Sequence, residues 1–128
     1  MKKLFISVPM KGRTEEQIKA SMDKMHKIAE AVFGEQLEVI DSFIEGSEYN
    51  GKPIACLGES IKRMQEADYF IGPSDAWDHR GCWFESEVVR RYFERENGFY
   101  VEEEFFLTEE EIQKKREEPT DCMPRRVK

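Results

Sequence analysis

The segment WDHRGCWFE (77–85) concentrates groups whose types and spacing could do chemistry. It ends in Glu85, which follows two bulky aromatic residues and a loop rich in ionisable side chains. A carboxylate kept charged at the mouth of a sheet can attack a sugar carbon or stabilise an oxocarbenium ion. The dipole of a helix, however, favours acids in its first turn without any chemistry. Glu85 is therefore the leading catalytic candidate, with a structural role as the alternative.

The rest of this loop offers weaker signals. Trp77 could stack on a flat ring, or it could cap the core beneath the loop. We interpret Cys82 as a small packing residue, because no histidine and acid accompany it in the arrangement that activates a thiol. His79 and Cys82 lack a second ligand pair at zinc spacing. We therefore expect neither a metal nor a cofactor.

A second polar loop, PMKGRT (9–14), has the composition of an anion cradle. Gly12 lets the backbone approach a ligand closely, Arg13 offers a planar fork of donors, and the helix that follows presents its positive end. The loop is not a Walker motif, because it lacks that glycine spacing and the Lys-Ser/Thr pair. The alternative is that Lys11 and Arg13 are two solvated cations in a surface turn.

These loops must be positioned by regular elements, which the hydrophobic periodicity predicts. The expected strands are 4–8, 37–41, 67–72 and 99–106. Thr14 and Gln17 form a capping box that opens a helix ending at Gly34, and Pro53 begins a second helix. A third helix is expected over 83–97, which would place Glu85 in its first turn. The residues expected on the buried faces are Ile18, Met22, Met25, Ala29 and Val32, then Ile54, Leu57, Ile61 and Met64, then Phe84, Val88 and Tyr92, with Val89 and Phe93 adjoining.

Strands that alternate with helices predict an α/β fold. We expect a single domain with an open parallel sheet of four to five strands and helices on both faces, flavodoxin-like or Rossmann-like. In the strand order 2-1-3-4 the direction of winding reverses between the first and third strands, and ligands bind at that point. The loops 9–14 and 73–82 follow those two strands, so we expect them to meet. The domain spans 1–106, and 107–128 form a C-terminal helix and tail.

Composition excludes several classes of function. The chain has 128 residues, of which 39% are apolar and 37% charged, as in a globular domain of this size. A net charge of −7 argues against binding to nucleic acid or to an anionic membrane. Three widely separated cysteines make a disulfide framework unexpected, and no apolar run has the length of a membrane span or of a signal peptide. We therefore expect a cytoplasmic location.

Three features together resemble the nucleoside 2-deoxyribosyltransferase superfamily. A short strand and a small-residue turn open the chain, ADYFIG (67–72) forms the third strand, and GCWFE (81–85) follows a polar loop. The resemblance is strongest to small bacterial and phage members, in which a W-x-x-x-G-C-x-x-E segment is typical. The positions that match this segment are Trp77, Gly81, Cys82 and Glu85. It covers residues 3–101 and leaves the tail outside.

The resemblance implies a covalent mechanism. Glu85 would be the nucleophile that takes a 2-deoxyribosyl group from a base and holds it as a glycosyl-enzyme. Asp78 or Asp75 would protonate the departing base, with Glu59 as a further candidate. Characterised members carry an aspartate on the second helix that orients the substrate, and Ser60 stands at that position here.

The resemblance also implies how a substrate would be bound. Trp77 and the Pro9-Met10 turn would flank the base or the sugar. The basic first loop resembles that of the deoxynucleoside 5′-monophosphate N-glycosidases, in which it holds the 5′-phosphate, and this favours a nucleotide ligand and hydrolysis over transfer. The residues expected to contact the substrate are Pro9, Met10, Lys11, Gly12, Arg13, Trp77, Gly81 and Cys82.

Three functions follow as hypotheses. The first is cleavage or transfer at the N-glycosidic bond of a (deoxy)nucleoside or nucleoside 5′-monophosphate. The second is a nucleotide-binding or nucleotide-sensing module of the same fold without chemistry. A third, weaker hypothesis is a glycosidase for another N-glycoside such as NAD. By family analogy we expect a homo-oligomer, in which the FLTEEEIQKKREE segment (106–118) could complete a neighbouring pocket.

Overall fold

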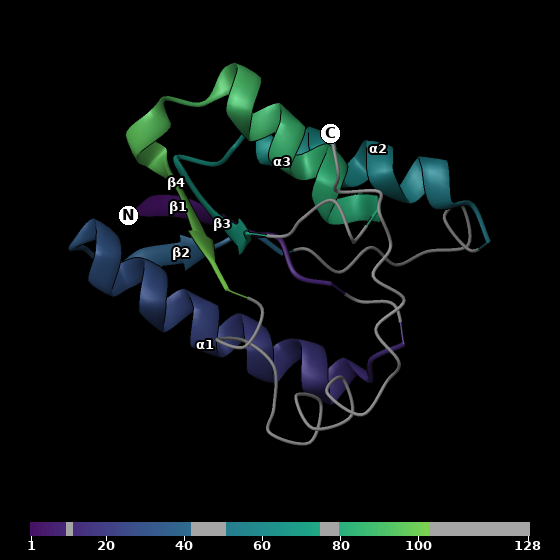
Figure 1. Ribbon diagram of the computed structural model, residues 1–128, viewed down its shortest axis with the longest axis horizontal. Helices are drawn as coiled ribbons and strands as arrows, with labels where there is room; N and C mark the ends of the chain where they lie inside the picture. The colour runs from purple at the N-terminus through teal and green to yellow at the C-terminus, as the bar shows by residue number, and fades with distance from the viewer. Residues whose placement is uncertain (10–11, 42–50, 75–79, 103–128) are drawn as a thin grey trace.

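The computed structural model describes residues 1–9, 12–41, 51–74 and 80–102 (Figure 1). The elements in chain order are β1 (Lys2–Ile6), α1 (Glu15–Phe33), β2 (Leu37–Val39), α2 (Pro53–Met64), β3 (Tyr69–Pro73), α3 (Arg80–Tyr92), a short 3₁₀ helix (Arg95–Asn97) and β4 (Gly98–Val101). All three strand pairings are parallel, and the strand order is β2-β1-β3-β4. The α/β fold, its parallel sheet and the predicted strand order are confirmed.

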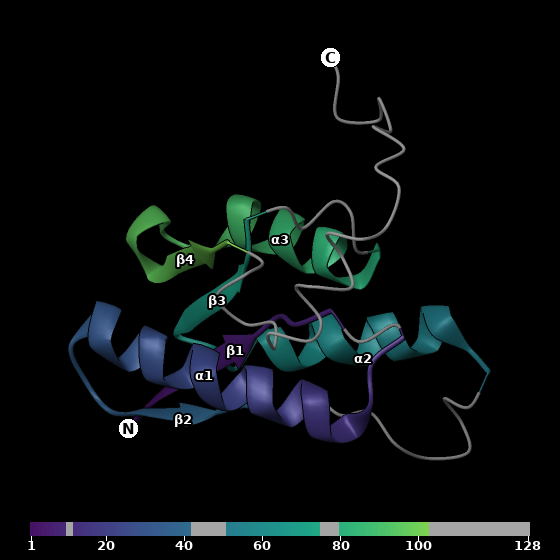
Figure 2. The ribbon, with the colours of Figure 1, turned by 60° about the horizontal axis from the view of Figure 1, so that its bottom comes forward.

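The helices form two layers, one on each side of the sheet. Helix α1 lies on one side, and α2 and α3 lie on the other (Figures 1 and 2). Side chains alternate between the faces of a strand, so β1 contributes to both layers. Leu4 and Ile6 pack in the core beneath α1, whereas Phe5 packs with Phe70 and Val89 beneath α2 and α3. The residue after this strand, Ser7, continues the alternation toward α2 and α3.

The local signals at the helix ends act as expected. The Thr14 hydroxyl accepts from the backbone N–H of Gln17 at 3.1 Å, and the Gln17 side chain accepts from the backbone N–H of Thr14 at 2.9 Å. Gly34 ends α1 in the left-handed conformation, with φ at 74°, where a side chain would be strained. Pro53 is the first residue of α2. These positions fix where the polypeptide leaves the sheet and returns to it.

Helix α3 begins and ends earlier than predicted. The expected range was 83–97, but the helix starts at Arg80 and ends at Tyr92. The backbone N–H of Phe93 still donates to the carbonyl of Val89 at 3.0 Å, and Glu94 then turns extended, with ψ at 144°. The separate 3₁₀ helix accounts for the rest of the periodic segment. As a result Glu85 lies one turn further into the helix than expected.

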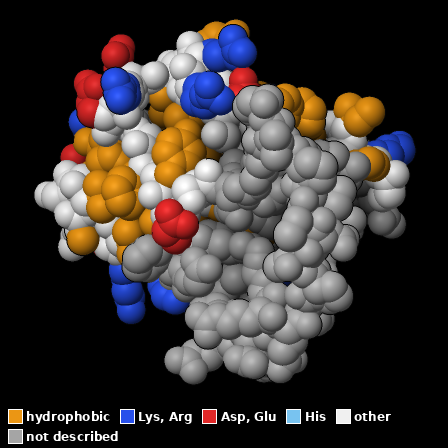
Figure 3. Space-filling view, viewed as in Figure 1, with side chains coloured by type: hydrophobic (Ala, Val, Ile, Leu, Met, Phe, Trp, Pro, Cys, Tyr) orange, Lys and Arg blue, Asp and Glu red, His pale blue; other side chains and the backbone are white. Residues whose placement is uncertain are grey.

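Several large apolar residues predicted to be buried are exposed. Ile54 keeps 85% of its surface exposed, Tyr92 81%, Val32 45% and Phe84 39%. The prediction that Ile54 faces the core, and that Phe84 and Tyr92 mark the inner side of α3, is therefore wrong. Hydrophobic side chains are correspondingly visible on the α2 and α3 side of the surface in Figure 3.

The buried faces of the two helices combine small and large side chains. Helix α2 buries Ser60 and Met64, and helix α3 buries Cys82 and Val89. Cys82, Glu85 and Val89 share one side of α3, because residues three and seven positions apart lie on the same helix face. The large residues Phe84 and Tyr92 lie on other sides of α3 and are exposed. The inner stripe of α3 therefore has a carboxylate at its centre.

The strands differ from prediction only at their ends. β1 starts at Lys2, and β2 stops at Val39. β3 spans Tyr69–Pro73 and starts later than predicted, because the residues between α2 and β3 form turns with hydrogen bonds such as Ala67 N–H to Met64 C=O. Residues 103–106 of the fourth predicted strand and the whole predicted tail, 107–128, lie outside the described residues. Among the described residues no helix combines the length and apolarity needed to cross a membrane.

Candidate active site

Glu85 lies on the inner face of α3, next to the carboxyl end of β1. The first turn of α3 holds no acidic residue, so the prediction that Glu85 is a first-turn acid stabilised by the helix dipole is wrong. The chain places this carboxylate by packing and hydrogen bonding, with a partner on each of two other elements. The helix dipole therefore does not explain why an acid lies at this position, and the explanation must come from the residues that contact Glu85.

Two serine hydroxyls hold the Glu85 carboxylate, one on each oxygen. Ser7 Oγ donates to Oε1 at 2.6 Å, and Ser60 Oγ donates to Oε2 in a short hydrogen bond. Ser7 follows β1 and is 1% exposed, and Ser60 lies on α2 and is 9% exposed. The carboxylate therefore joins three elements that are distant in sequence. We call these three residues the Ser7–Glu85–Ser60 cluster.

Opposing influences act on the ionisation of Glu85. Removal of the carboxyl group from water disfavours its charged form and raises its pKa above the ordinary value of 4.5. The hydrogen bonds from Ser60 and Ser7 favour the charged form and lower the pKa, but they only partly offset the effect of burial. Burial therefore has the larger effect, and the pKa of Glu85 lies above its ordinary value.

Gly72 on β3 leaves space for the side chain of Ser7, one member of the cluster. A Cβ atom added at Gly72 would lie 2.8 Å from Cζ of Phe70 and 3.2 Å from Cβ of Ser7. Phe70 is fully buried, so its ring cannot move aside at little cost. A glycine at this position therefore allows Ser7 and Phe70 to pack side by side on the face below α3.

The described part of the first loop is shaped by Arg13. Its guanidinium donates to the carbonyls of Pro9, at 3.0 Å, and Gln17, at 3.1 Å, and to the hydroxyl of Ser21, at 2.5 Å. Pro9 and Ser21 are buried, and Gly12 is exposed with φ at 76°, a conformation that suits glycine. The planar donors of Arg13 thus tie the loop to α1.

The remaining predicted residues are only partly placed. Cys82 is buried on the inner face of α3, and Gly81 is exposed, with open space where a Cβ would lie. Glu59, a predicted general-acid candidate, forms an ion pair with Arg63 at 3.0 Å. The predicted site residues that lie outside the described residues are Met10, Lys11, Trp77 and Asp78, together with Asp75 and His79.

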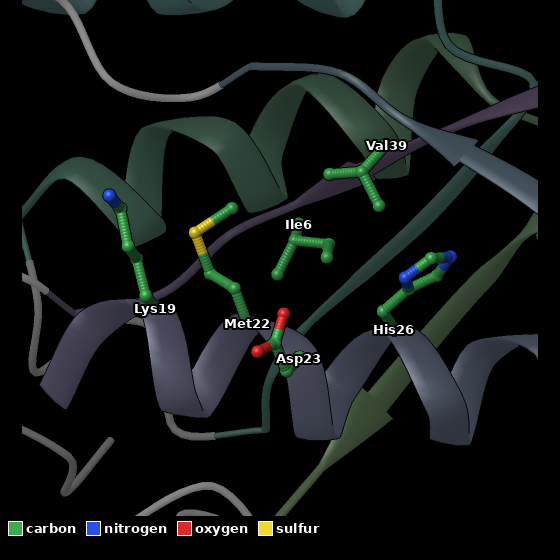
Figure 4. Close-up of a pocket in the computed structure, with 6 residues that line it drawn as sticks. All are labelled: Ile6, Lys19, Met22, Asp23, His26 and Val39. Atoms are coloured by element: carbon green, nitrogen blue, oxygen red, sulfur yellow. The ribbon is translucent and has the colours of Figure 1, made fainter. Parts of the chain in front are cut away.

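A separate groove lies on the opposite side of the sheet. It has a volume of about 230 Å³ and is lined by Ile6, Lys19, Met22, Asp23, His26 and Val39 (Figure 4). Four of these residues come from α1, one from β1 and one from β2, and none belongs to the predicted site. Within the described ranges no group of three or more histidine, cysteine or acidic side chains is placed to hold a metal ion.

Comparisons with other proteins give no independent assignment. The chain matches no family model, no curated protein and no solved structure. The site must therefore be interpreted from its own geometry.

Sequence reasoning identified Glu85 but missed its partners. Ser7 received no role because it lies within the predicted strand 4–8, where a buried serine gives no sequence signal of its own. Ser60 was noted only as a substitution for an aspartate. A usable signal was present in the alternation along β1, which places Ser7 on the same face as Phe5, toward the helix that carries Glu85.

Proposed function

We propose that this chain cleaves or transfers at the N-glycosidic bond of a (deoxy)nucleoside or nucleoside 5′-monophosphate, with Glu85 as the nucleophile. The observation that carries the proposal is the desolvated Glu85 carboxylate, fixed by Ser7 and Ser60 at the carboxyl end of β1. Ligands bind beyond this end of the strands in open parallel sheets. The resemblance of residues 77–85 to the nucleoside 2-deoxyribosyltransferases supports the same role.

The chemistry requires a charged carboxylate and no metal. One Glu85 oxygen forms a bond to the anomeric carbon of the sugar while the bond from that carbon to the base nitrogen breaks. The electron pair of the broken bond stays on the base, which takes up a proton. Water, or a second base, then displaces Glu85 from the sugar and restores the carboxylate. The two serines use two of the lone-pair positions of the carboxylate and leave others for the sugar.

The proton for the departing base has two candidate sources in the predicted loop. Asp78 and Asp75 belong to the segment outside the described residues, and Glu59 is occupied by its ion pair with Arg63. That pairing is the observation favouring the second candidate function, a nucleotide-binding module without turnover. The binding module requires no general acid, whereas the enzyme does.

Base release separates the two functions. The protein is incubated with the four deoxynucleosides, their 5′-monophosphates and the matching ribonucleosides, and free base is measured by chromatography. We expect release from at least one substrate class and, in Glu85→Gln, a loss of at least about a thousandfold, as for removal of other nucleophiles. Glu87→Gln is the matched control, because Glu87 is on the same helix and forms ion pairs with Arg90 and Arg91 at the surface.

Two results would contradict catalysis by Glu85. One is base release that is equally fast in Glu85→Gln and in the unaltered protein. The other is nucleotide binding, measured by calorimetry, with no base released from any substrate after prolonged incubation. The second result would establish the binding module instead.

A further inference from the structure

In the Ser7–Glu85–Ser60 cluster each serine hydroxyl donates to a different oxygen of Glu85, an arrangement that the proposed function does not itself require. A nucleophile needs only a charged oxygen near the sugar, yet here both oxygens are held, from two separate elements. We propose that Ser7 and Ser60 are paired positioning residues, each fixing one oxygen of the Glu85 carboxylate in its charged form and in one orientation. The catalytic consequence rests on the proposed function, whereas the effect on Glu85 itself does not.

The burial of the serines supports this assignment. Ser7 is 1% exposed and Ser60 is 9% exposed, so neither hydroxyl has ready access to bulk water. A buried hydroxyl without a partner costs free energy, and each of these donates to the carboxylate. A neutral carboxylic acid would have to donate its own proton to one of the two. Both hydroxyls can donate to the carboxylate at once only when Glu85 is ionised, so the two contacts favour the ionised form and oppose the effect of burial.

The two hydroxyls belong to different elements of the fold. Ser7 directly follows β1, and its backbone N–H donates to the carbonyl of Ile71 on β3 at 2.9 Å, so the sheet itself fixes this hydroxyl. Ser60 lies on α2, and its bond to Glu85 joins α2 to α3. The Ser7 hydroxyl thus fixes the carboxylate relative to the sheet, and the Ser60 hydroxyl fixes it relative to α2. Together they restrict rotation of the carboxylate plane, as a near-attack geometry requires.

Among the described residues, acidic side chains on α2 and α3 form ion pairs with arginines of the same helix. On α2, Glu59 bonds to Arg63 at 3.0 Å, and on α3, Glu87 bonds to Arg90 at 2.8 Å. The other titratable side chains on the packed elements include Cys56 on α2, Cys82 on α3, and Tyr100 on β4, whose hydroxyl accepts from Ser86 at 3.5 Å. The influences on Glu85 among the described residues are burial and the two hydroxyls. The two serines are therefore the groups that counter desolvation.

Titration of Glu85 tests the proposal directly. Its side-chain carboxyl carbon is followed by NMR against pH in the unaltered protein, in Ser7→Ala, in Ser60→Ala and in the double variant, with Glu85→Gln assigning the signal. We expect the pKa of Glu85 to rise in each single variant and to rise further in the double variant, because desolvation then acts with fewer opposing hydrogen bonds. Ser60→Thr keeps a hydroxyl and should restore most of the original titration.

Measurement of kcat and KM for the same variants shows how the two serines affect base release. At a pH below the pKa of Glu85 in these variants, we expect each single variant to lower kcat by about tenfold, the effect of losing one hydrogen bond to a charged group, with a smaller change in KM. Part of the loss should be recovered at higher pH, where Glu85 ionises without the serines. Ser86→Ala is the matched control, since this serine is next to Glu85 and contacts Tyr100 instead.

The outcomes separate this proposal from the proposed function. An unchanged Glu85 titration in the double variant would overturn the positioning role, even if Glu85→Gln is inactive. An upward shift of that titration, with no base release by any form of the protein, would keep the positioning role and reject the enzyme. If Ser7→Ala does not fold, the comparison of Ser60→Ala with Ser60→Thr decides: equal titration of Glu85 in these two overturns the proposal.

Discussion

Arg13 and Glu85 are two ionisable residues of the predicted site that the structure describes, and their surroundings differ: Arg13 lies in the loop after β1 and Glu85 lies on α3. The Arg13 guanidinium donates to two backbone carbonyls and to Ser21, so its charge shapes the loop that carries it. The Glu85 carboxylate is desolvated and held by two neutral hydroxyls from other elements. The Arg13 side chain therefore stabilises the backbone around it, whereas the Glu85 carboxylate joins elements that are distant in sequence.

The difference predicts which perturbation each region tolerates. The surroundings of Glu85 depend on close packing of small groups, so added volume should damage them. The Arg13 region depends on directional donors, so loss of the guanidinium should damage it. Three predictions follow from this contrast, ordered from the largest expected effect to the smallest.

Gly72→Ala should have the largest effect on stability. The new Cβ would lie 2.8 Å from the ring of Phe70 and 3.2 Å from Cβ of Ser7, so one of them must move. We expect a loss of about 2–3 kcal/mol in the free energy of unfolding, as for other overpacked cores. Base release should also fall, because Ser7 no longer meets Glu85. Denaturant unfolding and the base-release assay measure the two effects.

Gly58→Ala on α2 is the control for this prediction, because a Cβ there meets nothing within 4 Å. Helix propensity should make it neutral or slightly stabilising. A Gly72→Ala variant as stable as the unaltered protein would show that the packing around Ser7 is looser than the distances indicate.

Arg13→Ala should destabilise the protein by about 2 kcal/mol, because it removes donors to two carbonyls and leaves the hydroxyl of Ser21 buried without its present donor. Arg13→Lys should recover little, since an ammonium cannot reproduce the planar fork. Thermal unfolding with and without nucleotide measures both the stability and the affinity. If Arg13→Ala keeps full stability and loses only nucleotide affinity, Arg13 is an anion ligand, and the contrast with Glu85 is wrong.

The pH dependence of stability should show the smallest effect. The folded-state pKa of Glu85 is raised, so the folded protein binds this proton more tightly than the unfolded chain does. The stabilisation from the proton is complete below the ordinary value of 4.5 and is lost as the pH rises through the raised folded value. The unaltered protein should therefore lose stability relative to Glu85→Gln across that window. A difference between the two that does not change with pH would contradict a desolvated carboxylate.

Much of the fold could be predicted from the sequence, because its signals are local. The capping box at Thr14, the left-handed Gly34 and Pro53 at the start of α2 each act within one turn of the chain. The alternation of strands and helices then determines the parallel sheet, and with it the end of the sheet at which a site should form.

The buried face of α3 could not be predicted in the same way. Counting large apolar residues favours the stripe of Phe84 and Tyr92, which the structure leaves exposed. The stripe that packs inward contains Glu85, whose two carboxylate oxygens accept hydrogen bonds from Ser7 and Ser60. Ser7 and Ser60 are 78 and 25 residues away from Glu85 in sequence, so no local sequence pattern predicts that they contact it.

The most direct test of the central claim is to trap the sugar on Glu85. The protein is mixed with the deoxynucleotide that it cleaves best, quenched rapidly in acid, and examined by intact-mass and peptide mass spectrometry. We predict a mass gain of one deoxyribosyl unit, with its phosphate where the substrate carries one, on the peptide that contains Glu85, and no gain in Glu85→Gln. Base release without any adduct on Glu85, or an adduct on another residue that persists in Glu85→Gln, would contradict its role as the nucleophile.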